Sequence, residues 1–348
     1  MARDLEETEA LGRGGRAGAL PLVPRPSALY PSAMRIVFMG SGEFGLPTLR
    51  ALAAAHEVVL VVTQPDRPAG RHRQLAPTPI GQWAAASVVP TIKPLNVNDE
   101  DVQRAIAGAR ADVAVVIAFG QYIRPAVVDT PRLGTVNLHG SLLPKYRGAA
   151  PINWAIINGE RETGNTVIRV AAKMDGGDML GQRALTIEPG ETAGELHDRL
   201  AARGPDLVLE ALERMAVGTM TEIAQDESQA TVAPKLSRAD GWVDFAAPPE
   251  VVRNRIHGLT PWPGVTSWWS ASPEAERHRL MLLRVKEVAD ARHSVEPGTV
   301  IADGVIACGG GGAVRLVEVQ SPGKRQMSWA DYTHGHAVPV GAVFGGGV

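Results

Sequence analysis

The sequence has one cysteine, no long apolar run and almost no net charge, and each absence excludes a class of protein. Cys308 cannot form an internal disulfide and has no cysteine partners for a zinc site, so the chain suits a reducing cytoplasm, with Cys308 as a small buried hydrophobic residue. No apolar run approaches the ~18 residues that span a bilayer. The net charge of −2 lacks the basic excess that is typical of proteins whose whole surface binds nucleic acid.

What is present fits an ordinary globular protein of about two domains, because 348 residues can bury a sizeable core and 45% of them are hydrophobic. Residues 1–33 mix small residues, proline and arginine with acidic residues, which predicts a disordered extension, or an upstream start codon with Met34 as the working start. We expect a first domain over 34–220, a polar linker over 221–239 and a second domain over 240–348.

Short apolar strands alternate with helices in the first domain, which predicts an α/β fold with a doubly wound, mostly parallel sheet. The second domain has short β-like runs between Gly/Pro turns, which predicts a small β-barrel. The expected strands are 35–39, 57–63, 112–118, 135–138, 265–269, 280–285, 298–301 and 314–319, and the expected helices are 46–55, 99–107, about 150–157 and 196–215.

Asn137 and His139 stand two residues apart on one of these strands, directly before a Gly/Pro-rich turn. Residues i and i+2 of a strand point to the same face, so both side chains would enter one pocket. Asp175 lies in a later glycine-rich turn. An amide, an imidazole and a carboxylate together can hold an oxyanion, move a proton and orient the imidazole, which is the equipment for attack on a carbonyl carbon.

The same three residues also have structural interpretations. His139 is then a core histidine, Asn137 a strand-end cap and Asp175 a turn-capping carboxylate. The surrounding segment, NLHGSLLPKYRGAAPINWAI from residue 137, favours the chemical interpretation. Together with Asp175, this segment resembles the signature of the 10-formyltetrahydrofolate-dependent formyltransferases.

A second segment, TQPDRPAGRHRQLAPTP at residues 63–79, resembles the loop with which the methionyl-tRNA-specific members of that family contact the acceptor arm. The family usually has a small residue where His72 stands, which puts the fine geometry of the loop in doubt. The resemblance implies tRNA contacts from Arg67, Arg71 and Arg73, although a solvated Pro/Gly turn accounts for the same residues. It extends from Met34 to the C-terminus, where Lys324 and Arg325 are the expected backbone contacts.

The resemblance implies that the chain transfers the formyl group of 10-formyltetrahydrofolate to the α-amine of methionine on initiator methionyl-tRNA. Asn137 and His139 would donate hydrogen bonds to the oxyanion, and Asp175 would orient the imidazole. It also implies a Rossmann-like catalytic domain and an OB-like barrel for tRNA. We expect a monomer, and we expect no metal because the histidines are scattered without ligand spacing and formyl transfer to an amine needs no Lewis acid. The residues expected to border the folate are Phe119, Gly120, Ser141, Leu142, Leu143 and Pro144.

Three alternatives remain at this point. A folate-dependent formyltransferase could use another amine as acceptor. The run GSGEFG at residues 40–45 follows a strand, opens a helix and satisfies the dinucleotide fingerprint, with Asp66 near the place of a ribose-binding acid, so an NAD(P)-dependent oxidoreductase is the main rival. That interpretation leaves the 141–144 turn and Asp175 without a role. A non-catalytic RNA-binding protein would have no use for Asn137, His139 and Asp175.

Overall fold

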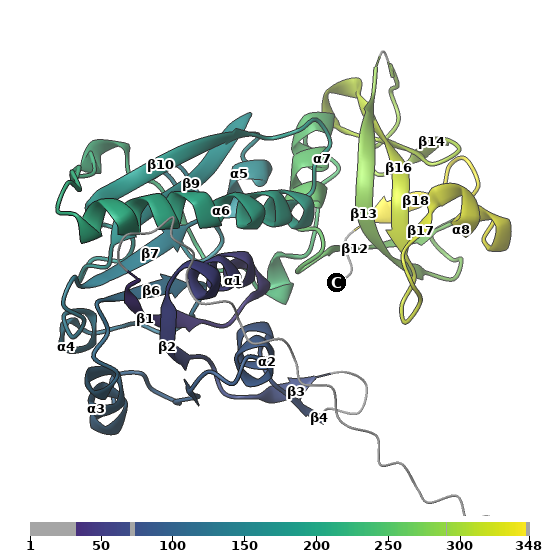
Figure 1. The fold of residues 1–348 in the computed structure, drawn as a ribbon. Coiled ribbons are helices and arrows are strands. Elements are labelled where there is room, and N and C mark those ends of the chain that lie inside the picture. Colours follow the sequence, from purple (N-terminus) through teal and green to yellow (C-terminus); the bar gives the residue numbers. More distant parts are fainter. Residues whose placement is uncertain (1–32, 70–73, 290, 346–348) are drawn as a thin grey trace, which may run out of the picture.

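The computed structural model describes residues 33–69, 74–289 and 291–345, and Figure 1 shows them as an α/β domain joined to a β-barrel. The seven strands of the α/β sheet are, in spatial order, β10 (Met179–Thr186), β9 (Glu162–Arg169), β7 (Thr135–His139), β6 (Val113–Ile117), β1 (Arg35–Gly40), β2 (Glu57–Val62) and β5 (Thr91–Ile92). The five strands from β7 to β5 are parallel, and β9 pairs antiparallel with both β7 and β10. The predicted fold class is confirmed for this domain.

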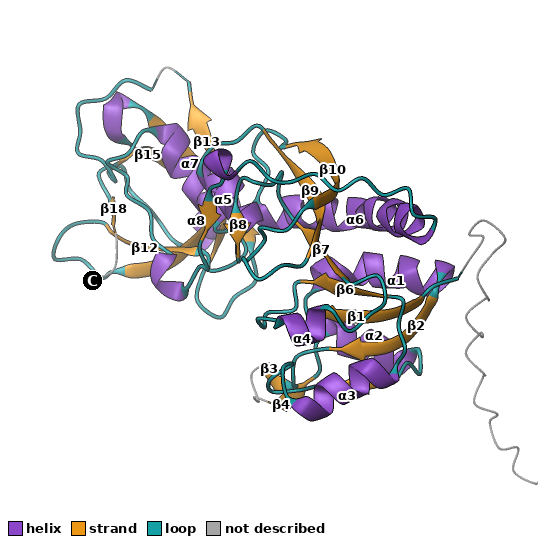
Figure 2. Ribbon diagram, turned by 90° about the vertical axis from the view of Figure 1, so that its left-hand side faces the viewer, coloured by secondary structure: helices purple, strands orange, loops and turns teal. Residues whose placement is uncertain are grey.

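Helices cover both faces of this sheet, as its apolar strands require (Figure 2). The helices α1 (Leu46–Ala55), α2 (Pro79–Ala86) and α6 (Ala193–Ala216) contribute to the core on one face. The helices α3 (Glu100–Gly108) and α4 (Pro125–Val128) cover the other face. The carboxyl ends of the parallel strands are thereby left for loops, which is where ligands bind in such folds.

The barrel is an antiparallel sheet that nearly closes on itself, again as predicted. Its strands are, in order, β14 (Val300–Ala302), β15 (Val305–Ala307), β16 (Ala313–Gln320), β13 (His278–Val288), β12 (Val265–Ser270) and β18 (Val343–Gly345), with β17 (Met327–Ser328) paired to β16. The Phe344 N–H donates to Gly298 O at 2.8 Å beside β14, which joins the two ends of the sheet. Cys308 is buried in this core, as expected, and burial raises the pKa of its thiol to about 11.

The described residues also form three further α-helices and four further short strands. The helices α5 (Pro151–Ile157) and α7 (Pro249–Gly258) pack against each other where the domains meet, and α8 (Trp329–Gly335) lies on the barrel. The strands β3 (Arg67–Ala69) and β4 (Gln74–Ala76) form a hairpin, and β8 (Arg147–Gly148) pairs with β11 (Val232–Ala233). The sequence analysis predicted none of β5, β9, β10, β17, β18 or these four strands, nor the helices α2, α4, α7 and α8. The segment expected to be a plain linker contains β11 and two turns of 3-10 helix.

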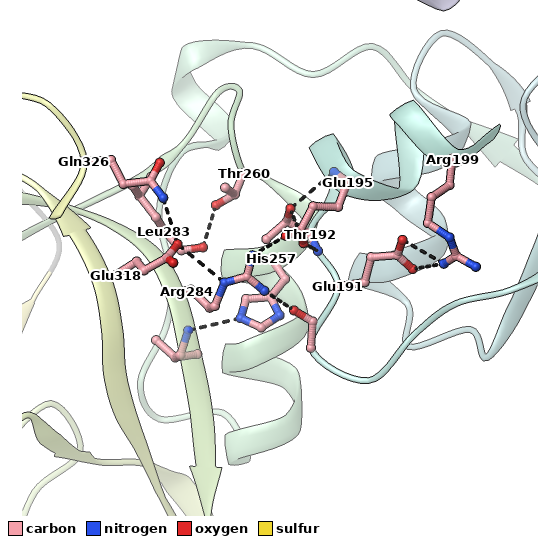
Figure 3. A network of polar contacts seen from close by, with 12 residues as sticks. Glu191, Thr192, Glu195, Arg199, His257, Thr260, Leu283, Arg284, Glu318 and Gln326 are labelled. Carbon is pink, nitrogen blue, oxygen red and sulfur yellow. Dashed lines mark hydrogen bonds and ion pairs between the residues drawn. The ribbon is translucent and has the colours of Figure 1, made fainter. Parts of the chain in front are cut away.

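The domains meet at the start of α6, where Arg284 of β13 reaches across (Figure 3). It donates to Gly190 O at 2.7 Å and to Glu195 Oε1 at 2.6 Å. Glu195 also caps α6, because its Oε2 accepts the Thr192 N–H at 2.9 Å. The carboxylate that starts the helix therefore also binds the barrel. No helix within the described residues is long and apolar enough to cross a membrane.

Candidate active site

The strand β7 places Asn137 and His139 on one face, because its other face is used by the core. Val136 and Leu138 pack beneath α1 and α6, so the alternating residues point the opposite way. Among the residues that the structure describes, none hydrogen-bonds the Asn137 side chain, whose residue is half-buried. Its amide is therefore available to a ligand, unlike that of a strand-end cap.

His139 has a partner at each ring nitrogen. Its Nε2 lies 2.8 Å from the Tyr146 carbonyl oxygen, which can only accept, so Nε2 carries a hydrogen. Its Nδ1 lies 3.7 Å from Asp175 Oδ2, beyond hydrogen-bond distance but close enough for an ion pair when the ring holds both protons. Only 6% of the His139 side chain and 16% of the Asp175 side chain are exposed, so this contact is little screened by solvent.

Asp175 does not cap its own turn. Its Oδ2 accepts the N–H of Gly148 at 2.9 Å, 27 residues earlier in the chain. The Asp175 backbone is in the left-handed region with φ of 50°, which aspartate adopts more readily than most residues other than glycine. The predicted triad thus comes together as a set, with Asp175 facing the histidine as the chemical interpretation requires.

The turn after β7 holds four of the residues expected to border the folate, Ser141, Leu142, Leu143 and Pro144. Its polar groups already have partners: the Ser141 hydroxyl donates to Lys145 O at 2.7 Å, and the Leu143 N–H donates to Thr166 Oγ1 at 3.1 Å. This turn is therefore rigid and offers mainly shape to a ligand.

Phe119 and Gly120 follow β6, the parallel neighbour of β7, so both turns lie at the same edge of the sheet. Phe119 is buried, and its carbonyl accepts from Ser41 and Gln64. Gly120 is exposed, with φ of 79°. The structure thus gives these six residues a common edge, and their contact with folate stays a prediction.

The glycine turn after β1 has a packing role. A Cβ on Gly40 would lie 2.6 Å from the Phe38 ring and 2.7 Å from Ile117 O, so only glycine fits. Asp66, the residue expected to bind a ribose in a dehydrogenase, pairs with Lys93 Nζ at 2.5 Å. These contacts account for the dinucleotide fingerprint without a dinucleotide.

Three of the five residues expected to bind tRNA are described, and they lie outside the triad. Arg67 begins the β3–β4 hairpin, is exposed and donates to Gln64 Oε1 at 3.1 Å. Arg71 and Arg73 lie outside the described residues. Lys324 and Arg325 are exposed in the turn between β16 and β17 of the barrel. Within the described residues, no group of three or more His, Cys, Asp or Glu side chains is arranged to hold a metal ion.

Comparison with known proteins identifies the family. A formyl transferase model matches residues 34–212, and a formyl transferase C-terminal domain model matches residues 235–337. The methionyl-tRNA formyltransferase of Geobacter metallireducens is 38% identical over 318 residues, which cover 90% of this chain and 99% of that protein. The chain belongs to the methionyl-tRNA formyltransferase family. The enzyme of the same name from Acidobacterium capsulatum is 41% identical over 310 residues, 88% of this chain and 97% of that protein.

Solved structures share the fold of this methionyl-tRNA formyltransferase family member. HypX from Aquifex aeolicus in complex with tetrahydrofolic acid matches with a TM-score of 0.58 at 18% identity, over 87% of this chain and 47% of that one. WlaRD, a sugar 3N-formyl transferase, matches with a TM-score of 0.60 at 13% identity, over 84% of this chain and all of that one. The chain is an enzyme that formylates methionyl-tRNA, with formyl-tetrahydrofolate as co-substrate.

One polar residue beside the site, Gln225, was not singled out in the sequence, whereas its partner Arg147 was expected only to line a crevice at the sheet edge. The guanidinium of Arg147 binds Gln225 and Glu227, and the Gln225 amide binds the Asp175 turn. Arg147 lies inside the signature segment, where an arginine among small residues was a usable signal. Gln225 lies in the polar linker, and nothing in the local sequence distinguishes it from its neighbours.

Proposed function

We propose that the reaction proceeds by direct attack of the methionine α-amine of initiator methionyl-tRNA on the formyl carbon of 10-formyltetrahydrofolate. The new C–N bond gives a tetrahedral intermediate with a negative oxygen, and the intermediate collapses by breaking the bond to N10. The amine loses a proton and N10 gains one. The observation that carries this proposal is the unbonded Asn137 amide on the face of β7 that also bears His139 and Asp175.

Asn137 Nδ2 donates one hydrogen bond to the oxyanion, and an oxyanion donor typically contributes ~3 kcal/mol, or about a hundredfold in rate. His139 donates the second from Nε2, which requires this N–H to be shared with or released by the Tyr146 carbonyl. Asp175 orients the ring through Nδ1 and stabilises its charged form. A water-mediated path along this pair moves the proton toward N10.

The remaining parts of the proposal concern binding. Residues 34–220 form the catalytic domain, 221–239 the linker and 240–348 the tRNA-binding barrel, and the two turns at the sheet edge border the folate. The exposed Arg67, with Arg71 and Arg73 nearby in sequence, contacts the acceptor arm, and Lys324 and Arg325 contact the tRNA backbone. The enzyme acts as a monomer in the cytoplasm, without a metal.

The test measures formyl transfer from 10-formyltetrahydrofolate to charged initiator methionyl-tRNA, beside free methionine, glycinamide ribonucleotide and a no-acceptor control. Asn137→Leu, which removes the amide at similar size, is expected to lower kcat with the charged tRNA about a hundredfold. Unchanged kcat in this variant would remove Asn137 from the mechanism. Transfer to another acceptor in preference to the initiator tRNA would overturn the proposed acceptor.

A further inference from the structure

Gln225 lies in the connection between α6 and α7, residues 217–248, and its side chain contacts the turn that carries Asp175. Its side-chain Nε2 donates to the Asp175 carbonyl at 2.8 Å and to the Gly177 carbonyl at 2.7 Å. Both hydrogens of one amide are thus used on a single turn. Two of the three residues from Asp175 to Gly177 are glycines, so the turn has few conformational restraints of its own. Gln225 supplies restraints that the turn sequence lacks.

Arg147 fixes which way the Gln225 amide faces. Its Nε and Nη2 donate to Gln225 Oε1 at 3.0 and 2.7 Å. A guanidinium has only donors, so Oε1 must face Arg147 and Nε2 must face the turn. Glu227 holds the other edge of the guanidinium, accepting from Nη1 at 2.9 Å and from Nη2 at 3.1 Å. The hydrogen bonds from Arg147, and then from Lys173, lower the pKa of Glu227 to about 2, so this carboxylate stays charged across the working range of pH.

The same connection also fixes the donor to the Asp175 carboxylate. That donor is the N–H of Gly148 in β8, which pairs with β11 further along the connection. Gly148 has φ of 123°, and a Cβ there would lie 2.5 Å from Ala233 O. The close approach of β11 therefore requires glycine at the position whose N–H binds Asp175. The connection holds both the backbone of the catalytic turn and the partner of its carboxylate.

We propose that Gln225, oriented by Arg147, is a positioning residue that holds the Asp175 carboxylate against His139. This inference rests on the proposed role of Asp175. The gap of 3.7 Å between Asp175 Oδ2 and His139 Nδ1 leaves little room for displacement, since a further 1 Å at such a site can cost about a hundredfold in rate. Gln225 does not touch substrate or the reacting atoms in this proposal, and it acts only through the Asp175 turn.

Gln225→Glu is the sharpest variant, because it keeps an oxygen for Arg147 and removes both hydrogens donated to the turn. We expect kcat with initiator methionyl-tRNA to fall about 10- to 100-fold, with KM for each substrate within about twofold. Gln229→Glu is the matched control in the same connection, because among the described residues the Gln229 side-chain amide donates only to the exposed Asp226 carboxylate. Its kcat should stay within about twofold of the parent. Thermal unfolding of both variants records any general loss of stability.

A double-mutant cycle with Asp175→Asn separates positioning from a purely structural role. If Gln225 acts through the Asp175 carboxylate, Gln225→Glu should cost little further kcat in the Asp175→Asn background. The same fold-loss in both backgrounds, or a normal kcat with only a lower unfolding temperature, would overturn the inference and leave the role of Asp175 intact. A normal kcat for Asp175→Asn alone would instead overturn the proposed role of Asp175, and this inference with it.

Discussion

Two arginines, Arg147 and Arg284, each bind side chains from a distant part of the sequence, but they lie in different surroundings. The Arg147 side chain is 7% exposed and binds the connection between the domains, and its neighbour Gly148 binds Asp175. The Arg284 side chain is 24% exposed and binds Glu195 of the other domain, and its neighbour Val285 binds His257. The contacts of Arg147 lead to the proposed catalytic residue Asp175, and those of Arg284 lead to a packed interface between the domains.

The histidines of the two regions sharpen this difference. His139 has the Asp175 carboxylate beside it, within the distance of an ion pair that its proposed role requires. His257 accepts the Val285 N–H at its Nε2, so it is neutral there. Burial, and then the Arg284 and Arg253 cations, lower the pKa of His257 to about 4, although Glu195 opposes them. Both histidines are buried, but His139 lies beside a carboxylate, whereas the surroundings of His257 disfavour its charged form.

The largest effect is expected from His139→Ala, which removes the proposed second oxyanion donor and the proposed proton carrier together. We expect kcat to fall by about 10²- to 10⁴-fold, while a folate analogue still binds in equilibrium dialysis. The matched control is His257→Gln, a buried histidine of the other cluster, whose kcat should stay within about threefold. A kcat for His139→Ala within tenfold of the parent enzyme would show that His139 does not have the proposed catalytic role.

The next effect concerns stability against pH. The folded-state pKa of His257 is about 4, below the unfolded value of 6.5, so the unfolded chain binds more protons between these values. The stabilisation is therefore fully present above pH 6.5 and is lost as pH falls toward 4, by about 3 kcal/mol from this residue. Burial also lowers the pKa of His56, which adds to the same slope.

His257→Gln should flatten this loss in chemical unfolding measured between pH 7 and pH 4, because an amide oxygen still accepts the Val285 N–H and does not titrate. The exposed His334 of the barrel provides the control, and His334→Gln should leave the slope unchanged. An equally steep slope in His257→Gln would show that other groups dominate the acid response.

A smaller loss is expected for Arg284→Ala, which removes the bonds to Gly190 O and Glu195. Because the Glu195 side chain is half exposed, we expect the free energy of unfolding to fall by only about 1–2 kcal/mol. The kcat should stay within about twofold, in contrast with the variants near Asp175. Lys286→Ala, an exposed basic residue two positions along β13, controls for the loss of charge. A kcat loss as large as that of Gln225→Glu would mean that domain docking also governs the chemistry.

Much of the fold was predictable because its signals are local. The helix α1 begins and ends where the sequence predicted, since an apolar pattern between turn residues defines it. The strand β9 was missed because its sequence ETGNTVIR is polar, although six of its eight residues are buried. Asn165 in that strand donates to Leu200 O, a partner that only the tertiary structure supplies.

The site residues, too, were predictable only where their signals are local in the sequence. Asn137 and His139 were predictable from their spacing, because alternation along a strand places them on one face. Asp175 was singled out as a carboxylate in a later glycine-rich turn, but no local spacing places it beside His139, and the resemblance of the whole segment to a known signature supported its role. Gln225 could not be found, because it meets the Asp175 turn across 50 residues, in a connection that the β8–β11 pairing holds in place. The residues that hold the site are thus less visible in sequence than the residues that act in it.

The smallest effect is expected at exposed basic residues of the two domains that contact neither Arg147 and its partners nor Arg284 and its partners. Arg67→Ala in the α/β domain and Lys324→Ala in the barrel should each lower kcat/KM for tRNA by about two- to fivefold at moderate salt. Each lost phosphate contact should reduce the slope of log kcat/KM against log salt by about 0.7–0.9. The kcat and the unfolding temperature should stay unchanged, because both residues are exposed.

Arg104→Ala on α3 is the control for net charge, since its side chain is 71% exposed and pairs only with the nearby Glu100 among the described residues. It should leave the salt slope as it is. A changed slope for Arg67→Ala alone would assign the phosphate contacts to the catalytic domain, and a change for Lys324→Ala alone would assign them to the barrel. If all three variants changed the slope equally, the tRNA would be responding to overall charge, because local contacts predict a difference between these positions and Arg104.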